Sequence, residues 1–442
     1  MTVRPRGHGS ECVRPQVADG ESAGDRVADH VAGDGFGGAG PRTGACGDDG
    51  MRHSKRRIAA SVLVAGTALL LAACGNSNGQ NSLQPKGQAA RQIDDLFIPI
   101  LTLAIVIGIL VVGATIFAAF RFRHREGKPD NPKQVHGNTP LEIGWTIVPA
   151  LILAVVAVPT ISTLWDLAQR PKGPEVLKVH VTGKQWWWQF QLPKQPLVPQ
   201  SKTDRYPTAE SAGGPVDGAN GMVTTSTELH IPVGTKVDLF LHARDVIHSF
   251  WIPELNGKKD VMPARTNHLT LESDKPGTYL GACAEYCGLS HADMRMRVIV
   301  EPMAKWKAWL ADISGPPAQT FGTKDDPNEI YDLTTNTYGC TNCHVFNDAL
   351  SPNYGPNLTH LDSRTTFAGG TLSLRGPDAR QNLTEWIMNA PSKVAMESKD
   401  CRLPPPATCT GMPSFTKNTP KGQKTMTPED AAVIVNFLLG EK

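Results

Sequence analysis

The chain has 442 residues, a length that allows two or three domains. Its 44 basic and 42 acidic residues nearly cancel, so overall charge gives no argument for a nucleic-acid partner. Hydrophobic residues make up an ordinary 40%, but two long apolar runs lie between residues 94 and 168, and most of the nine cysteines fall in close pairs. Such pairs indicate a metal, a cofactor or disulfides rather than scattered core thiols.

The N-terminal part contains two different kinds of sequence. Residues 1–50 are rich in Gly, Asp and Arg without apolar periodicity, which is typical of a disordered or mis-assigned upstream extension. Residues 51–73 have the basic start, apolar centre and small-residue end of a signal peptide. The ending Leu-Ala-Ala-Cys resembles a bacterial lipobox, which predicts lipidation of Cys74. A buried anchor helix with an incidental cysteine is the alternative. We expect translation to start at Met51.

The two apolar runs predict a transmembrane hairpin over residues 94–168. Residues 96–120 are almost wholly apolar, and at about 1.5 Å per residue they span a hydrocarbon core of about 30 Å. Basic residues follow directly, as in a cytoplasmic loop. The second run, residues 143–164, has Trp145 and Trp165 near its ends, where interfacial aromatics lie. Both ends of the hairpin are therefore expected outside the cytoplasm.

From about residue 175 the apolar pattern changes to a period of two. The predicted strands are residues 176–181, 227–231, 236–241, 268–271 and 296–300. Short strands without intervening helices favour a β-sandwich or barrel, here assigned to residues 175–303. A short helix is expected at residues 304–313. Residues 326–442 are predicted to be helical, most clearly at 379–389 and 428–439, the latter capped by Thr427 with Asp430 closing a capping box.

One short segment gathers ligands suited to copper. Four potential ligands lie within twelve residues: Cys283, Cys287, His291 and Met294. Thiolate, imidazole and thioether together suit copper in electron transfer. His248 is expected on a neighbouring strand as a further ligand. A structural zinc site of two Cys and two His is the alternative, but zinc does not need the methionine and usually favours a two-residue gap between its cysteines.

A second constellation lies in the C-terminal part. Cys340-Thr-Asn-Cys343-His344 is the attachment motif of a c-type haem. A thiol–disulfide pair or half a zinc site is the alternative, and neither requires the adjacent histidine. Residues 355–358, Gly-Pro-Asn-Leu, resemble the class I cytochrome c loop whose proline carbonyl fixes the iron-binding histidine. Met412 is the expected sixth ligand.

Two further methionines and a pair of cysteines lie in the same C-terminal part. Met388 lies inside a predicted amphipathic helix and is expected in the core, whereas Met396 is a second candidate ligand. Cys401 and Cys409 are eight residues apart, in a part expected outside the cytoplasm, so we predict a local disulfide in preference to a metal site.

The pattern Cys-x-Glu-aromatic-Cys-Gly-x2-His-x2-Met at residues 283–294 resembles the CuA signature of the cytochrome c oxidase subunit II family, and the resemblance extends over residues 94–300. It implies a two-helix transmembrane hairpin, an all-β cupredoxin-like Greek-key sandwich and then an all-α class I cytochrome c domain. It also implies the ligands of a dinuclear copper centre. These are bridging Cys283 and Cys287, with His248 and Met294 on one copper, and His291 and the backbone carbonyl of Glu285 on the other.

The same resemblance implies roles for three more side chains. The Glu285 side chain would reach a magnesium ion at the boundary with subunit I. Trp186 would be the point where electrons come in, with a packed aromatic belt as the alternative. Glu142 would lie at the entrance of a proton pathway, with an ordinary interfacial glutamate as the alternative.

The resemblance implies an electron-transfer subunit of a respiratory haem–copper oxidase, passing electrons from haem c through CuA to haem a of subunit I, where oxygen reduction drives proton pumping. The expected partners are subunits I and III, and cytochrome c or a cytochrome bc complex as donor. The chain is expected in a bacterial membrane with both redox domains on the outer face. Three rivals are a quinol oxidase subunit, which would lack the copper ligands, a CuA-type nitric oxide reductase subunit, and a stand-alone periplasmic copper-handling protein.

Overall fold

The computed structural model describes residues 79–124, 127, 134, 136–194, 222–346, 354–396, 411–416 and 424–440, together with positions 61 and 66. Apart from positions 61 and 66, the predicted signal peptide lies outside the described residues, as do Cys74 and the predicted Cys401–Cys409 disulfide. All elements below belong to residues 76–442, which form one compact unit.

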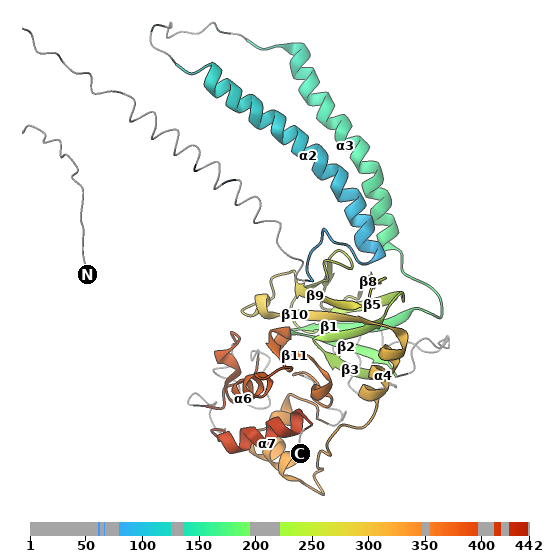
Figure 1. Cartoon of the computed structure of the whole chain (residues 1–442), viewed down its shortest axis with the longest axis vertical. Helices are drawn as coiled ribbons and strands as arrows, with labels where there is room; N and C mark the ends of the chain where they lie inside the picture. The colour runs from blue at the N-terminus through green and yellow to red at the C-terminus, as the bar shows by residue number, and fades with distance from the viewer. Residues whose placement is uncertain are drawn as a thin grey trace, which may run out of the picture. The chain divides into compact units, whose positions relative to one another are not determined.

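Two long helices, α2 (Gln88–Arg121) and α3 (Thr139–Ala168), form the predicted hairpin (Figure 1). Their most apolar windows have mean hydropathies of 2.9 and 2.3 with no buried residue, so both are long and apolar enough to cross a membrane. The start of α3 is capped twice. The Asn138 side chain accepts the Leu141 N–H at 3.2 Å, and the Glu142 carboxylate accepts the Asn138 N–H at 3.2 Å. Both helices are longer than the predicted apolar spans, residues 96–120 and 143–164.

Contacts on both sides of the hairpin attach it to the β-domain. Before α2, the Lys86 N–H donates to the Glu254 carbonyl at 2.7 Å. A Cβ on Gly87 would lie 2.4 Å from the Glu272 carbonyl oxygen, so only glycine fits at this crossing. After α3, Arg170 forms an ion pair with the buried Asp238 at 2.8 Å.

The β-domain is a sandwich of two five-stranded sheets, as the strand pattern predicted. One sheet has the order β3-β2-β1-β5-β8: β1 Leu177–Lys184, β2 Trp187–Pro193, β3 Met222–Ser226, β5 Val237–Ala243 and β8 Asn267–Leu271. The other has the order β4-β10-β9-β6-β7: β4 Glu228–Pro232, β6 His248–Trp251, β7 Lys259–Val261, β9 Gly277–Cys283 and β10 Arg295–Glu301. Five of these strands match those predicted from alternation, β6 is the neighbouring strand expected to carry His248, and β2, β3, β7 and β9 are additional.

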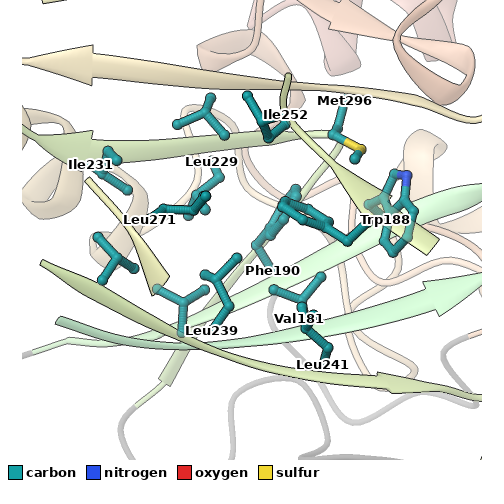
Figure 2. Close-up of a cluster of buried hydrophobic side chains, with 14 of the residues drawn as sticks. Val181, Trp188, Phe190, Leu229, Ile231, Leu239, Leu241, Ile252, Leu271 and Met296 are labelled. Carbon is teal, nitrogen blue, oxygen red and sulfur yellow. The ribbon is translucent and has the colours of Figure 1, made fainter. Parts of the chain in front are cut away.

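Alternate residues of both sheets fill the space between them. Figure 2 shows Trp188 and Phe190 of β2 pointing into this layer with Leu239 of β5, opposite Leu229 of β4 and Met296 of β10. All five are almost completely buried. Fully burying a side chain of this size contributes about 1.5–3 kcal/mol. The layer supplies the rigid base from which the ligand-bearing segments extend.

Helix α4 (Met303–Ser314) follows the last strand of the sandwich where a short helix was predicted. Its Trp306 is fully buried and donates its indole N–H to the His230 carbonyl at 3.0 Å. Trp309 stacks on the His230 ring with centroids 4.2 Å apart. These aromatic contacts hold α4 on β4.

The C-terminal part is built from short helices and turns around a second core. Its elements are α5 Glu329–Tyr331, a π-helical turn Asp332–Thr337, 3₁₀ turns Cys340–Asn342, Leu361–Ser363, Ala368–Gly370 (η6) and Ala390–Ser392, strands β11 Thr366–Phe367 and β12 Leu372–Ser373, and helices α6 Ala379–Asn389 and α7 Pro428–Leu438. Both predicted helices are present. Thr427 caps α7 by accepting the Asp430 N–H at 3.1 Å, and the Asp430 carboxylate accepts the Tyr338 hydroxyl proton at 2.5 Å.

Candidate metal centre

Two neighbouring strands and the loop after one of them bring the predicted copper ligands together. Strand β6 begins at His248 and pairs with β9, with Phe250 opposite Cys283. The position of His248 beside the cysteine-bearing strand was predicted and is confirmed. The loop from β9 to β10 carries the remaining candidates, and the Cys283 N–H donates to the Met294 carbonyl at 2.9 Å. This hydrogen bond closes the loop.

The two thiols lie at the centre of the cluster. Cys283 Sγ and Cys287 Sγ are 3.8 Å apart, and both side chains are buried. Around Cys287 Sγ lie His291 Nδ1 at 3.7 Å and Met294 Sδ at 3.8 Å. Each thiol therefore has soft or imidazole donors within the reach of a bound metal ion.

The other side of the cluster belongs to Cys283. Its Sγ lies 3.9 Å from His248 Nδ1 and 3.2 Å from the backbone carbonyl of Glu285. The Glu285 side chain is exposed. All six predicted copper ligands thus converge on the thiol pair. The donor set of two thiols, two imidazoles, a thioether and a carbonyl suits copper, and the fully buried Met294 sulfur beside Cys287 argues against zinc.

Two residues that the sequence interpretation assigned no role fix His248. The Asp245 carboxylate accepts a hydrogen bond from His248 Nε2 at 2.8 Å, leaving Nδ1 toward the thiols. Such second contacts orient ligand histidines. A Cβ on Gly183 of β1 would lie 2.8 Å from His248 Cδ2, so glycine makes room for the ring. Asp245 and Gly183 both lie in stretches that share the family resemblance, residues 245–253 and 183–188, but neither stretch marks their contact with His248.

The surroundings set the pKa values of these groups. Burial alone would lower the pKa of His248, but hydrogen bonds with Asp245 and Cys283 outweigh it and raise the pKa. The hydrogen bond from Cys287 lowers the pKa of Cys283, with His248 and backbone donors adding to the effect. The pKa of Cys287 is raised by its hydrogen bond to Cys283 and by burial, and the charge of a neighbouring Cys283 thiolate raises it further. Two adjacent thiolates therefore call for a cation between them.

The loop carbonyl of Cys287 is held by the segment before β2. Gln185 Nε2 donates to it at 2.7 Å and Trp186 Nε1 at 3.1 Å. Trp186 is 8% exposed, and Gly288 approaches its ring so closely that a Cβ would lie 3.1 Å away. Trp186 is thus in direct contact with the ligand loop, and its role in receiving electrons stays a prediction.

The second candidate site gathers around His344. The two thiols of the motif flank a 3₁₀ turn, and the His344 N–H donates to the Cys340 carbonyl at 2.9 Å. His344 Nδ1 lies 2.9 Å from the Pro356 carbonyl, as the loop motif predicted. A Cβ on Gly355 would lie 2.6 Å from the imidazole ring, so this glycine is required for the contact.

Burial keeps the groups of this second site in their neutral forms. It raises the pKa of Cys340 to about 12 and that of Cys343 to about 11. It also lowers the pKa of His344 despite the hydrogen bond to Pro356. A neutral imidazole with its second nitrogen fixed is the form that binds iron. The residues therefore fit a c-type haem.

The candidate sixth ligands lie on two described segments of the C-terminal part. Met412 and Met388 both pack against the second core. The Met412 N–H donates to Met396 Sδ at 3.1 Å, so the Met396 sulfur is engaged as an acceptor. The choice of Met412 as ligand remains a prediction. Glu142, the residue expected at a proton-pathway entrance, lies in the first turn of α3 and is exposed.

Two known protein families match the helical hairpin and the β-sandwich of this chain. A family described as cytochrome c oxidase subunit II, periplasmic domain, matches residues 177–302, and one described as cytochrome c oxidase subunit II, transmembrane domain, matches residues 76–163. The first match contains every candidate copper ligand, and the second contains α2 and most of α3.

Three individual proteins illustrate the similarity. The cytochrome c oxidase subunit 2 of Alkalihalophilus pseudofirmus is 34% identical over 332 residues, covering 73% of this chain and 86% of that protein. The quinol oxidase subunit 2 of Bacillus anthracis is 29% identical over 279 residues, covering 61% and 84%. The solved periplasmic domain of subunit II of the cytochrome oxidase of Bradyrhizobium japonicum is 23% identical with a TM-score of 0.25, covering 33% of this chain and 96% of that one.

Proposed function

The chain belongs to the cytochrome c oxidase subunit II family, and we propose that it carries a dinuclear copper centre and a covalently bound c-type haem as the electron-transfer subunit of a haem–copper oxidase. One observation supports this above all others: six donor groups converge on the thiol pair Cys283–Cys287. The chain supplies electron transfer, and the oxygen-reducing centre belongs to subunit I.

In the proposed copper centre Cys283 and Cys287 would hold both copper ions. His248 and Met294 would be further ligands of one copper, and His291 and the Glu285 carbonyl further ligands of the other. A bound copper pair or c-type haem supplies one-electron redox chemistry. The chain's own contribution is rigidity, because both thiols are buried and the β6–β9 pairing fixes one imidazole relative to them. A donor cage that keeps its shape lowers the cost of changing oxidation state.

In the proposed class I cytochrome c domain, Cys340 and Cys343 hold the haem covalently, His344 binds the iron, and Met412 is the sixth ligand. The Pro356 carbonyl at 2.9 Å from His344 supports this assignment, since it fixes the ring nitrogen that does not face the metal. The alignment with the Alkalihalophilus relative covers 73% of this chain, which is more than residues 1–302 could supply. The alignment therefore extends beyond residue 302, the end of the sandwich match.

The copper ligands also separate the proposed function from its rivals. A quinol oxidase subunit is expected to lack them, although such a subunit is 29% identical over 279 residues. A nitric oxide reductase would use the same electron-transfer module with a different catalytic subunit. A stand-alone copper-handling protein would have no use for an oxidase-type membrane hairpin, which the transmembrane-domain match includes.

The loop between β9 and β10 that carries most of the copper ligands, residues 284–294, is here called the copper loop. The surface next to it is apolar. Val246 and Ile247 precede the first ligand, and Tyr286 and Leu289 flank the second thiol; all four are exposed, Tyr286 by 74%. Apolar side chains grouped around a buried site favour a protein partner. We assign this surface to subunit I, with a magnesium ion at the Glu285 side chain.

The remaining assignments extend this picture. Subunit III is a further partner, and cytochrome c or a cytochrome bc complex is the donor. Both redox domains lie on the outer face of a bacterial membrane. Lipidation of Cys74 and a Cys401–Cys409 disulfide are also proposed, at positions outside the described residues. Trp186 receives electrons, and Glu142 lies at a proton-pathway entrance.

Purification of the complex with its natural partner subunits tests the proposal. Optical spectra should contain both a-type and c-type haem bands, and metal analysis should give two copper ions per chain at the thiol pair. A b-type haem beside haem c would favour the reductase. A single zinc ion at the thiol pair, or no associated haem subunit, would contradict the oxidase assignment.

A further inference from the structure

A buried carboxylate on the sandwich holds the C-terminal part. Glu228 of β4 is 1% exposed and faces Thr365 and Thr366 at the start of β11. Its oxygens accept the Thr365 N–H at 3.0 Å, the Thr365 hydroxyl and the Thr366 hydroxyl at 2.6 Å. A carboxylate with several donors aimed at it is a strong attachment, because a neutral group cannot satisfy them all.

Immediately after β11, the turn η6 packs in close contact with the copper loop. A Cβ on Gly369 in η6 would lie 2.4 Å from the Asp293 carbonyl oxygen and 3.1 Å from the Trp186 carbonyl oxygen. A Cβ on Gly370 would lie 3.1 Å from Thr227 Cγ2. Both glycines have positive φ, +65° and +81°. Backbone is therefore packed directly on backbone between η6 and the ligand loop.

A third contact joins the two candidate ligand loops. The fully buried Ser290, next to His291, donates its hydroxyl to the Ala395 carbonyl. The residue after Ala395 is Met396, whose sulfur accepts the Met412 N–H at 3.1 Å. Covalent bonds and two hydrogen bonds thus form a continuous connection from His291 to Met412.

We propose that Glu228 is a positioning residue that fixes the C-terminal domain on the copper loop, so that the Ser290–Ala395 hydrogen bond joins the His291 and Met412 ligand loops into one rigid unit. Electrons tunnel more readily through bonds and hydrogen bonds than through gaps, so this connection is the internal route between the two sites. The route rests on the proposed haem site; the docking itself does not.

Hydrogen–deuterium exchange of the full chain in its complex tests the docking without relying on oxidase activity. Gly369→Ala should open the contact, because the added Cβ meets the Asp293 carbonyl. Gly376→Ala is the matched control: Gly376 also has a positive φ, +87°, but nothing lies within 4 Å of its Cβ position. Both substitutions strain the backbone similarly, and only the first meets the copper loop.

Glu228→Gln is the second variant, because its amide NH₂ would face donors that now meet a carboxylate. Glu301→Gln on neighbouring β10 is its control, since Glu301 pairs with His230 and not with the C-terminal domain. We expect Gly369→Ala and Glu228→Gln to speed exchange in segments 289–295 and 364–370 roughly ten- to hundredfold, with both controls near the unchanged protein.

The outcomes separate the docking from the proposed function. Unchanged exchange in both test variants, or equal acceleration in their controls, would overturn the docking proposal even if copper and haem are bound. Absence of covalent haem in the unchanged protein would overturn the haem assignment, while the exchange result would still decide the docking. Where copper and haem are both bound, we expect Ser290→Ala to slow electron transfer from haem to copper while the copper and haem spectra stay unchanged. An unchanged transfer rate would overturn the route.

Discussion

His248 lies between a carboxylate that orients its ring and a thiol of the proposed metal site: its Nε2 is 2.8 Å from the Asp245 carboxylate, and its Nδ1 is 3.9 Å from Cys283 Sγ. Asp245 also accepts the Gln185 N–H at 2.7 Å, so it links the first imidazole to the segment that holds the ligand loop. The carboxylate therefore fixes the ring orientation and favours the deprotonated Nδ1 as a metal ligand.

Replacing Asp245 with Asn should weaken copper binding about 10- to 100-fold without abolishing it. The amide would present an NH₂ to a donor that now meets an oxygen. Titration with a competing chelator, followed by the copper absorption, measures the change. Asp260→Asn on the exposed strand β7 is the control and should bind copper normally. Equal affinities in both variants would remove Asp245 from the site.

Replacing one cysteine sulfur at a time should show which spectral signals belong to the copper pair and which belong to the haem. Cys287→Ser should abolish the electron-spin and near-infrared signals of the copper pair while the c-type haem remains, because a serine hydroxyl cannot bridge as a thiolate does. Cys343→Ser should leave the copper signals intact and remove one of the two covalent links to haem. Persistence of the copper signals in Cys287→Ser would contradict the bridging role.

The elements predicted best from the sequence are those that depend on local periodicity. The hairpin, five strands, helix α6 and the Thr427 cap follow from apolar spacing and capping residues. Strand β6 has four residues, too few for alternation to show, and β9 has seven residues that include Gly277 and Gly281, which interrupt the apolar pattern. Most copper ligands were predicted because they lie within one short loop.

Contacts between distant residues could not be predicted. Glu228 and Thr365 are 137 residues apart, and nothing around either position marks the pair. Tyr338 and Asp430 are 92 residues apart, and the Asp430 carboxylate, which was expected to close the capping box, accepts the Tyr338 hydroxyl proton. Gly183 makes space for His248 only because β1 passes behind β6 in the folded sandwich. Long-range packing determines these roles, whereas local sequence determines the elements.

Met412→Leu should lower the reduction potential of the haem, by on the order of 0.1 V or more, because axial ligands tune the potential over a range of about 0.8 V and methionine sulfur raises it. Redox titration of the c-type band measures the change. Met388→Leu is the control and should leave the potential near its original value, since Met388 lies inside α6. A fall in Met388→Leu alone would transfer the ligand role to that residue.

Acid should destabilise the sandwich through two buried histidines of one sheet. Burial is the main cause that lowers the pKa of His180 on β1 and of His242 on β5, each to about 4 from the ordinary 6.5. Unfolding exposes both rings and restores the ordinary pKa. Between pH 6.5 and 4 the unfolded chain therefore binds protons that the folded chain does not, so stability falls as the pH falls through this window and is unaffected above it.

At pH 5 each histidine should cost about 2 kcal/mol of stability relative to pH 7, with a combined effect below the sum because the two rings interact. Urea unfolding of the full chain in detergent, followed by tryptophan fluorescence, measures the difference. The double variant His180→Gln, His242→Gln should lose most of the pH dependence, whatever its stability at pH 7. His136→Gln, in the exposed loop before α3, should keep it. An equally steep loss in the double variant would assign the acid sensitivity to other groups.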